Sequence, residues 1–207
     1  LSALCAGGVI WSLAGAGDKL VWAFEVLPFG VPMGFALGRR PWLSGVSYVL
    51  LTGFFLVQCL GGRYSVVEVP FPHELMNALG LVRNPSDRIG HVFQGVVSAI
   101  LLREWLLRGS GLERGRTLFW VVTGCSLAIS AAYELVEMVV ALRFFSGSPD
   151  QWLGMQGDPF DAQWDMTMAL AGATIGQLLL SRLHDHSLER MSGIPGLLAE
   201  RRRVELH

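Results

Sequence analysis

Hydrophobic runs of membrane-spanning length follow one another along this 207-residue chain, and they constrain its fold more than any other feature. A helix of about 20 apolar residues crosses a hydrocarbon core of ~30 Å. Only 16% of the residues are charged, whereas about a quarter are charged in an ordinary soluble domain. The runs predict transmembrane helices near residues 20–38, 42–60, 86–107, 117–143 and 160–182.

The run at residues 1–13 would rise only ~20 Å as a helix, so we expect it to be the remainder of a longer first helix. With six helices, the clusters of positive residues fall on one side of the membrane, which is the cytoplasmic side. These clusters are Arg39/Arg40, Arg108/Arg114/Arg116 and the arginines from Arg182 onward. We predict an all-α, polytopic bundle of about six transmembrane helices in residues 1–183, with both termini inside. A polar, Arg-rich cytoplasmic tail follows in residues 184–207.

Composition excludes two classes of protein. The formal net charge is −1, so no basic surface is available for a nucleic-acid partner. Cys5, Cys59 and Cys125 lie in apolar runs without a Cys-x-x-Cys pair, which argues against a disulfide framework and a thiolate metal site. We expect the cysteines to be small core residues.

Acidic residues interrupt two of the apolar runs. They lie in YELVE (133–137) and in DPFDAQWD (158–165). A charged group near the centre of a bilayer costs at least ~2.5 kcal/mol on insertion scales, so an acidic residue there indicates a functional site.

The segments NPSDRIGH (84–91) and DPFDAQWD share one pattern. Asn84 and Asp158 are typical helix N-caps, and Pro85 and Pro159 are typical of the first helical position. Asp87 with His91, and Asp161 with Asp165, would each lie one turn apart on one helix face. One interpretation is simply two well-made helix starts. That interpretation does not cover His91 and Asp165, which would lie ~9 Å below the prolines.

The predicted orientation brings these titratable groups from three helices to one depth near the outer side. A histidine with several carboxylates suits a divalent cation such as Zn²⁺, Mn²⁺ or Mg²⁺, and it equally suits a proton relay. The candidate metal ligands are His91, Glu134, Glu137, Asp161 and Asp165. The candidate catalytic residues are His91, Glu134, Glu137 and Asp165. The candidate substrate-binding residues are Asp87, Arg88, Gln94, Asp158 and Gln163.

Structural roles compete with these functional ones. Glu134 and Glu137 could form buried ion pairs with Arg88 or Arg143, and His91 could be a hydrogen-bonded core histidine. We expect Arg103 and Glu104 to reach the interface or to pair locally, and His184 and His186 to be solvated tail residues. Gly172 and Gly176 form a small-xxx-small stripe that suits packing in the bundle or, second, association of two chains.

Three separated motifs resemble a known family. RNPSDRIGHVFQGVVSAILLREWLLR, LAISAAYELVEMVVAL and LGMQGDPFDAQWDMTMALAGATIG resemble the YjdF-like inner-membrane proteins of bacteria, a domain family of unknown function. The resemblance covers about residues 18–185. It implies a multi-pass protein of the bacterial inner (cytoplasmic) membrane and implies no activity.

A fainter resemblance is to VanZ-like membrane proteins, through Asp87/His91, Glu134 and Asp165/Gly172. The chain departs from that pattern, with Ala169 at the usual Asn and Glu137 at the usual Gln.

The leading hypothesis is a membrane-embedded enzyme that acts at the outer leaflet on a lipid-linked or envelope substrate. A metal or acid/base centre would do the chemistry, and Arg88 would orient an anionic group. The alternatives are a proton- or cation-coupled transporter or ligand-binding protein, and a helper subunit of a membrane complex. Membrane lipids are expected partners in each case.

Overall fold

The computed structural model describes residues 1–39, 42–147 and 149–192. In these ranges all regular structure is helical, as the sequence predicts. Arg40 and the predicted tail from residue 193 onward lie outside the described residues. The helices are α1 (Ser2–Gly15), α2 (Lys19–Gly38), α3 (Gly45–Tyr64), α4 (His73–Ala78), α5 (Ser86–Gly109), α6 (Arg116–Phe144), α7 (Pro149–Leu153) and α8 (Asp161–Ser192).

Four of the described helices, α2, α3, α6 and α8, are long and apolar enough to cross a membrane. Helix α5 has 24 residues and would also be long enough, but it carries charges at both ends, including Asp87 and Glu104. Helix α1 is apolar but has only 14 residues. The prediction of a polytopic helical membrane protein is therefore confirmed in outline, while the number of six spans and the orientation stay predictions.

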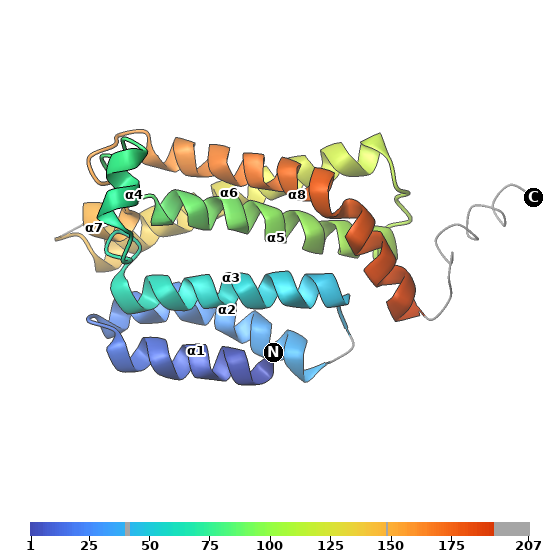
Figure 1. Ribbon diagram of the computed structural model, residues 1–207, viewed down its shortest axis with the longest axis horizontal. Helices are drawn as coiled ribbons and strands as arrows, with labels where there is room; N and C mark the ends of the chain where they lie inside the picture. The colour runs from blue at the N-terminus through green and yellow to red at the C-terminus, as the bar shows by residue number, and fades with distance from the viewer. Residues whose placement is uncertain (40–41, 148, 193–207) are drawn as a thin grey trace, which may run out of the picture.

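The long helices form two layers (Figure 1). Helices α1, α2 and α3 make one layer around a core that includes Cys5, Trp22, Val26 and Cys59. Helices α5, α6 and α8 make the other. Cys5 and Cys59 are thus core residues as predicted, whereas Cys125 is exposed, so that part of the prediction is wrong.

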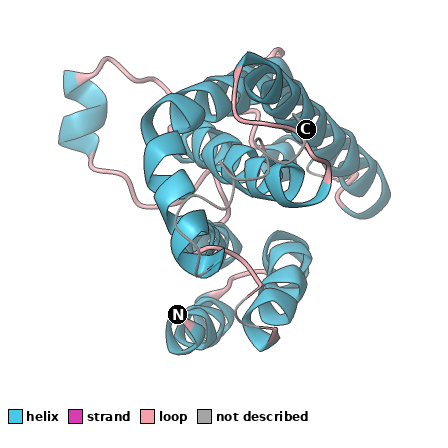
Figure 2. Ribbon diagram, turned by 90° about the vertical axis from the view of Figure 1, so that its right-hand side faces the viewer, coloured by secondary structure: helices cyan, strands magenta, loops and turns pink. Residues whose placement is uncertain are grey.

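The two layers contact each other at both ends of the bundle. We call the end where α4 and α7 lie the α4 end (Figure 1). There Phe24 of α2 packs against Phe144, Phe145 and Trp152 of the other layer. Helix α4 itself stands off the bundle on two loops (Figure 2). Helices α5 and α8 begin at the α4 end, and α6 ends there (Figure 1).

Helices α5 and α8 approach each other closely because small residues line their contact. A side chain at Gly95 would collide with the carbonyl of Ala169, and one at Gly172 would collide with the carbonyl of Val92. Gly176 packs in the same way on Val96. Packing inside the bundle, the first use expected for Gly172 and Gly176, is therefore observed; association of two chains stays a prediction.

The Asx-Pro segments build turns rather than helix caps. Asn84 Oδ1 accepts from the backbone N–H of Ser86 at 3.0 Å, and Asp158 Oδ1 accepts from that of Phe160 at 3.0 Å. Helix α5 begins at Ser86, and α8 begins at Asp161. Helix α5 thus begins one residue later than predicted and α8 two residues later, because each Asx side chain closes a turn before its helix starts. Asp87 and Asp161 do lie in the first turns of these helices, as predicted.

His184 is fully buried, contrary to the prediction that it is a solvated tail residue. Helix α8 continues to Ser192, past the end of its apolar run, so His184 stays inside the bundle. It contacts Arg103 at 3.0 Å and Glu104 at 3.3 Å, both on α5. His186, two residues further along α8, is exposed as expected.

Candidate functional site

Three helices bring a histidine and carboxylates together at the α4 end. Asp87 and His91 come from α5, Glu134 and Glu137 from α6, and Asp165 from α8. Ligand atoms of Asp87, His91 and Asp165 lie within 4.8 Å of one another, and so do those of His91, Glu134 and Glu137. We call these five residues the carboxylate–histidine cluster. The predicted convergence of three helices on one level is therefore observed.

His91 is the centre of the cluster and is buried. Its Nε2 lies 3.7 Å from Asp87 Oδ1 and 3.6 Å from Glu134 Oε1. Its Nδ1 lies 3.0 Å from the amide oxygen of Gln94. Because that oxygen can only accept, the contact assigns the proton of the neutral ring to Nδ1. The lone pair of Nε2 then faces the carboxylates, which is the arrangement of a metal-binding histidine with a supporting hydrogen bond.

Two acceptor atoms of the cluster have no hydrogen-bond partner within the described part of the chain. They are Oδ1 of Asp165 and Oε1 of Glu134, and both are buried. The whole Asp165 residue is only 2% exposed. Burial of a carboxylate oxygen without a donor is costly. The cluster therefore has more negative groups than its own donors balance, which is the condition that a bound cation relieves.

Arg83, which sequence reasoning missed, closes the rim of the cluster. It pairs with Asp161 in a short contact and lies 3.8 Å from both Asp87 and Asp158. It also donates to the backbone oxygen of Gly154 at 3.1 Å. Gly154 has φ +74°, and a side chain there would collide with the Asp87 carboxylate. This pairing occupies Oδ1 of Asp161 and places Asp161 at the rim, outside the two groups of ligand atoms found in the described residues. Its role as a metal ligand stays a prediction.

Arg88 and Asp158 form a second rim pair, at 2.6 Å. The pKa of Asp158 is lowered from its usual value by the hydrogen bond from the backbone N–H of Phe160, and Arg88 lowers it further. Because Arg88 is engaged with Asp158, it does not form the ion pair with Glu134 or Glu137 that we considered. Arg143, the other partner considered, lies over the ring of Phe144.

The predicted substrate-binding residues divide into three groups. Asp87 and Gln94 lie at the cluster, and Arg88 and Asp158 lie at its rim. Gln163 is exposed, and its backbone oxygen accepts from Thr167. The structure thus does not bring Gln163 to the site, because it is two residues from both Asp161 and Asp165 and so lies on the opposite face of α8.

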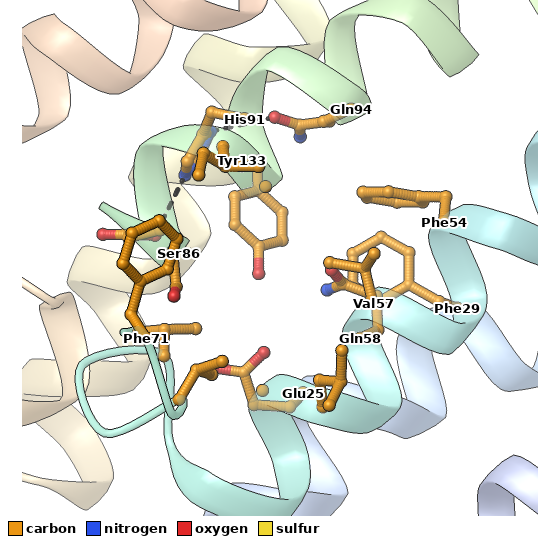
Figure 3. Close-up of a pocket in the computed structure, with 17 residues that line it drawn as sticks. Glu25, Phe29, Phe54, Val57, Gln58, Phe71, Ser86, His91, Gln94 and Tyr133 are labelled. Atoms are coloured by element: carbon orange, nitrogen blue, oxygen red, sulfur yellow. Dashed lines mark hydrogen bonds and ion pairs between the residues drawn. The ribbon is translucent and has the colours of Figure 1, made fainter. Parts of the chain in front are cut away.

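A cavity of about 260 Å³ adjoins the cluster (Figure 3). Asp87, His91 and Gln94 form one wall, and Phe29, Phe54 and Phe71 are among its apolar lining. Figure 3 shows the hydroxyl of Tyr133 and the carboxylate of Glu25 directed into it.

Sequence reasoning missed Glu25 and Tyr133. Glu25 is 5% exposed on α2 and lies across the cavity from His91. The rule that singled out Glu134, an acidic residue within an apolar run, applies equally to Glu25 and could have found it. Tyr133 carries no comparable signal in the sequence.

Comparisons with known proteins agree with the resemblance predicted from the three motifs. A family model described as "Predicted membrane protein (DUF2238)" matches residues 1–186. The inner membrane protein YjdF of Escherichia coli (strain K12) is 40% identical over 190 residues, which is 91% of this chain and 90% of the relative. No solved structure matches significantly. The fainter resemblance to VanZ-like proteins receives no support from these comparisons. The chain belongs to the DUF2238 family of predicted membrane proteins.

Proposed function

We propose that this protein is a metal-dependent enzyme of the bacterial inner membrane that acts on a lipid-linked substrate. One observation carries the proposal: the carboxylate–histidine cluster, in which His91 and Asp165 are buried, contains buried acceptor atoms on Asp165 and Glu134 that have no donor in the described part of the chain. A divalent cation would supply the missing positive charge. The name of the Escherichia coli relative supports a location in the inner membrane. The apolar lining of the adjoining cavity supports an amphiphilic substrate.

The ligand set favours a hard or borderline cation. One imidazole with carboxylates is the donor set of Zn²⁺, Mn²⁺, Fe²⁺ and Mg²⁺ sites, and neither group of ligand atoms includes a thiolate. His91 belongs to both groups and is therefore the common ligand. Its hydrogen bond with Gln94 fixes the ring for this role.

Hydrolysis is the reaction class that suits these residues. A bound cation lowers the pKa of a coordinated water towards 7, so that it can lose a proton to a neighbouring carboxylate. Glu137, in the second group of ligand atoms, would accept that proton. The chemistry that the cation would supply is activation of water for hydrolysis of an ester or phosphoester bond, and Glu137 would pass the proton taken from that water to the oxygen of the leaving alcohol.

Metal analysis of the purified protein tests the proposal. We expect stoichiometric divalent metal in the wild type and loss of it in Asp165→Asn and Glu134→Gln. Asp185→Asn is the matched control. Asp185 is also an acidic residue of α8, but it lies away from the cluster and forms an ion pair of 2.6 Å with Arg103. Wild-type protein without metal, or a metal content that is equal in all variants, would sink the proposal.

A proton- or cation-coupled transporter is the second candidate, and the position of Glu25 favours it. Glu25 lines the 260 Å³ cavity beside the cluster and also a second cavity of about 670 Å³, which Asp18, Arg63 and Glu68 line. A buried carboxyl between two cavities suits a path for protons. Proton flux into proteoliposomes that Glu25→Gln abolishes, from a protein without metal, would favour transport over hydrolysis.

A further inference from the structure

A second apolar space runs along the bundle from the cluster. It is a groove of about 660 Å³ between α2 and α3 on one side and α5 and α6 on the other. Its apolar lining includes Phe24, Leu51, Leu101, Trp105, Ile129 and Val136. We call it the α2–α6 groove. Its size falls in the range of pockets that hold small-molecule ligands.

The α2–α6 groove begins at the candidate site. Gln94, which holds His91, lines the groove, and so do Tyr133 and Glu137. Phe29, Phe54, Gln94 and Tyr133 line both the groove and the cavity beside His91. A molecule in the groove would therefore present one end to the polar cluster and the rest of its length to apolar side chains.

The length of the groove matches one leaflet of a bilayer. It follows α5 from Gln94 to Trp105, and 11 residues of helix rise ~16 Å. The hydrocarbon core of a bilayer is ~30 Å thick, so one leaflet measures about half of that. A chain that starts at the level of the cluster and lies along the groove would reach Trp105, close to the far end of α5.

The side of the groove is open to its surroundings. Trp105 is 67% exposed and Val136 is 58% exposed, and both line it. Polar and charged molecules lose their hydration when they enter such a surface inside a membrane, which costs free energy. A hydrocarbon chain does not pay this desolvation cost. Open apolar walls and leaflet length together select one occupant, which is an acyl chain of a membrane lipid.

We propose that the α2–α6 groove holds an acyl chain of a leaflet lipid, which enters sideways from the bilayer and places its headgroup linkage at His91 and Glu137. This assignment rests on the proposed function and specifies its substrate class. The acyl chain positions the lipid, and the ester or phosphoester bond near the headgroup is the one that reaches the cluster.

Photo-crosslinking in vesicles tests the groove. The full chain is placed in vesicles of phosphatidylethanolamine and phosphatidylglycerol that carry a trace of phosphatidylethanolamine with a diazirine on one acyl chain. Labelled residues are then identified by mass spectrometry. We expect labelling of Val97 and Leu101, which are among the residues of α5 that line the groove.

A matched pair of variants separates the groove from ordinary surface lipid. Val136 and Val139 are both on α6 and both 58% exposed, but only Val136 lines the groove. We expect Val136→Trp to lose the labelling of α5 and Val139→Trp to retain it. Because both side chains are exposed, neither variant should change the unfolding temperature, and that measurement accompanies the labelling.

Each outcome has a distinct meaning because metal content is measured on the same samples. Equal labelling of α5 in the two variants would overturn the proposal that the groove holds an acyl chain. The proposal would also be overturned if an unlabelled long-chain polyprenyl phosphate competed more strongly than an unlabelled phospholipid. Metal-loaded protein with either result would leave the metal centre intact. Specific labelling of a protein that holds no metal would support the groove and reject the metal enzyme.

Discussion

Helix α5 has a buried cluster of charged residues near each end, and the two clusters differ in one respect. At the end away from α4, Glu104 is almost fully buried and accepts hydrogen bonds on every side. Its donors are the backbone N–H of Ser44 at 2.9 Å, the hydroxyl of Ser47 at 2.6 Å and the guanidinium of Arg108 at 2.8 Å. His184 lies 3.3 Å from it. We call this arrangement the Glu104 network.

The carboxylate–histidine cluster at the α4 end uses the same residue types without the donors. His91 occupies the place that His184 has in the Glu104 network, with acidic side chains around it. Arg83 pairs mainly with the rim and reaches only Asp87 of the cluster, at 3.8 Å. Asp165 and Glu134 keep buried oxygens without partners in the described part of the chain.

The comparison separates structural from functional burial of charge. A fully satisfied polar network rigidifies a fold, whereas a partly satisfied one carries an energetic cost that the fold alone does not explain. The Glu104 network ties α3, α5 and α8 together. The carboxylate–histidine cluster is left ready for a ligand. Variants at the two ends should therefore respond in opposite ways.

The largest effect on stability is expected at Glu104. The Glu104→Gln variant places an amide among the donors Ser47 and Arg108 and removes the charge beside His184. Loss of one partner of a buried ion pair costs about 3–5 kcal/mol, so the free energy of unfolding in detergent should fall by that amount. Glu74→Gln, at an exposed position of α4, is the control and should stay within about 0.5 kcal/mol of the wild type. Equal stability of the two variants would contradict the structural role of the network.

Asp165 should show the opposite response. In metal-free protein, Asp165→Asn removes a buried charge whose Oδ1 lacks a donor, so the unfolding temperature should stay the same or rise. A metal at 100 times its dissociation constant should stabilise the wild type by about 2.7 kcal/mol and should leave Asp165→Asn unchanged. Thermal unfolding with and without added Zn²⁺ or Mn²⁺ measures both effects. Destabilisation of the metal-free variant would make Asp165 part of a structural network instead.

Arg83 lies between these extremes, because it pairs with Asp161 at the rim and with only one member of the cluster, Asp87. Arg83→Gln leaves Asp161, which is 3% exposed, without its cation. Loss of a hydrogen bond to a charged group predicts a decrease of about 2 kcal/mol in the free energy of unfolding. Arg88→Gln is the matched control, since its partner Asp158 is partly exposed, and its loss should be smaller. If both variants lose the same amount, burial of Asp161 does not decide the stability of the rim.

Local rules explain what could be predicted from the sequence. An acidic residue in an apolar run must be buried in protein or at a site, and spacings of three or four residues put two side chains on one helix face. These rules predicted the helices, the pairs Asp87/His91 and Glu134/Glu137, and the convergence on Asp165. Glu25 fulfils the first of these rules as well, because it also interrupts an apolar run.

The errors concern partners that are distant in sequence. The place of Asp161 at the rim could not be predicted, because its pairing with Arg83 spans 78 residues and depends on the fold of two loops. His184 looked like a tail residue because the apolar run ends before it, yet α8 continues where Arg103 and Glu104 provide buried partners. Spacing along a helix contains no information about such contacts.

The smallest effect is expected at Asp158, and it depends on pH. The hydrogen bond from the backbone N–H of Phe160 and the nearby Arg88 stabilise the ionised carboxylate, so its pKa in the folded protein lies below the usual value of about 3.9. A carboxylate with a lowered pKa adds stability that is fully present above its pKa in the unfolded chain and is lost as the pH falls through its pKa in the folded protein. Asp158→Asn should therefore unfold at a slightly lower temperature than the wild type at pH 6, and the difference should shrink below pH 4. Thermal unfolding of both proteins across this range measures the difference, and a gap that widens towards acid would contradict the lowered pKa. Because Asp158 is partly exposed at the rim, even its complete loss should leave the metal content of the cluster unchanged.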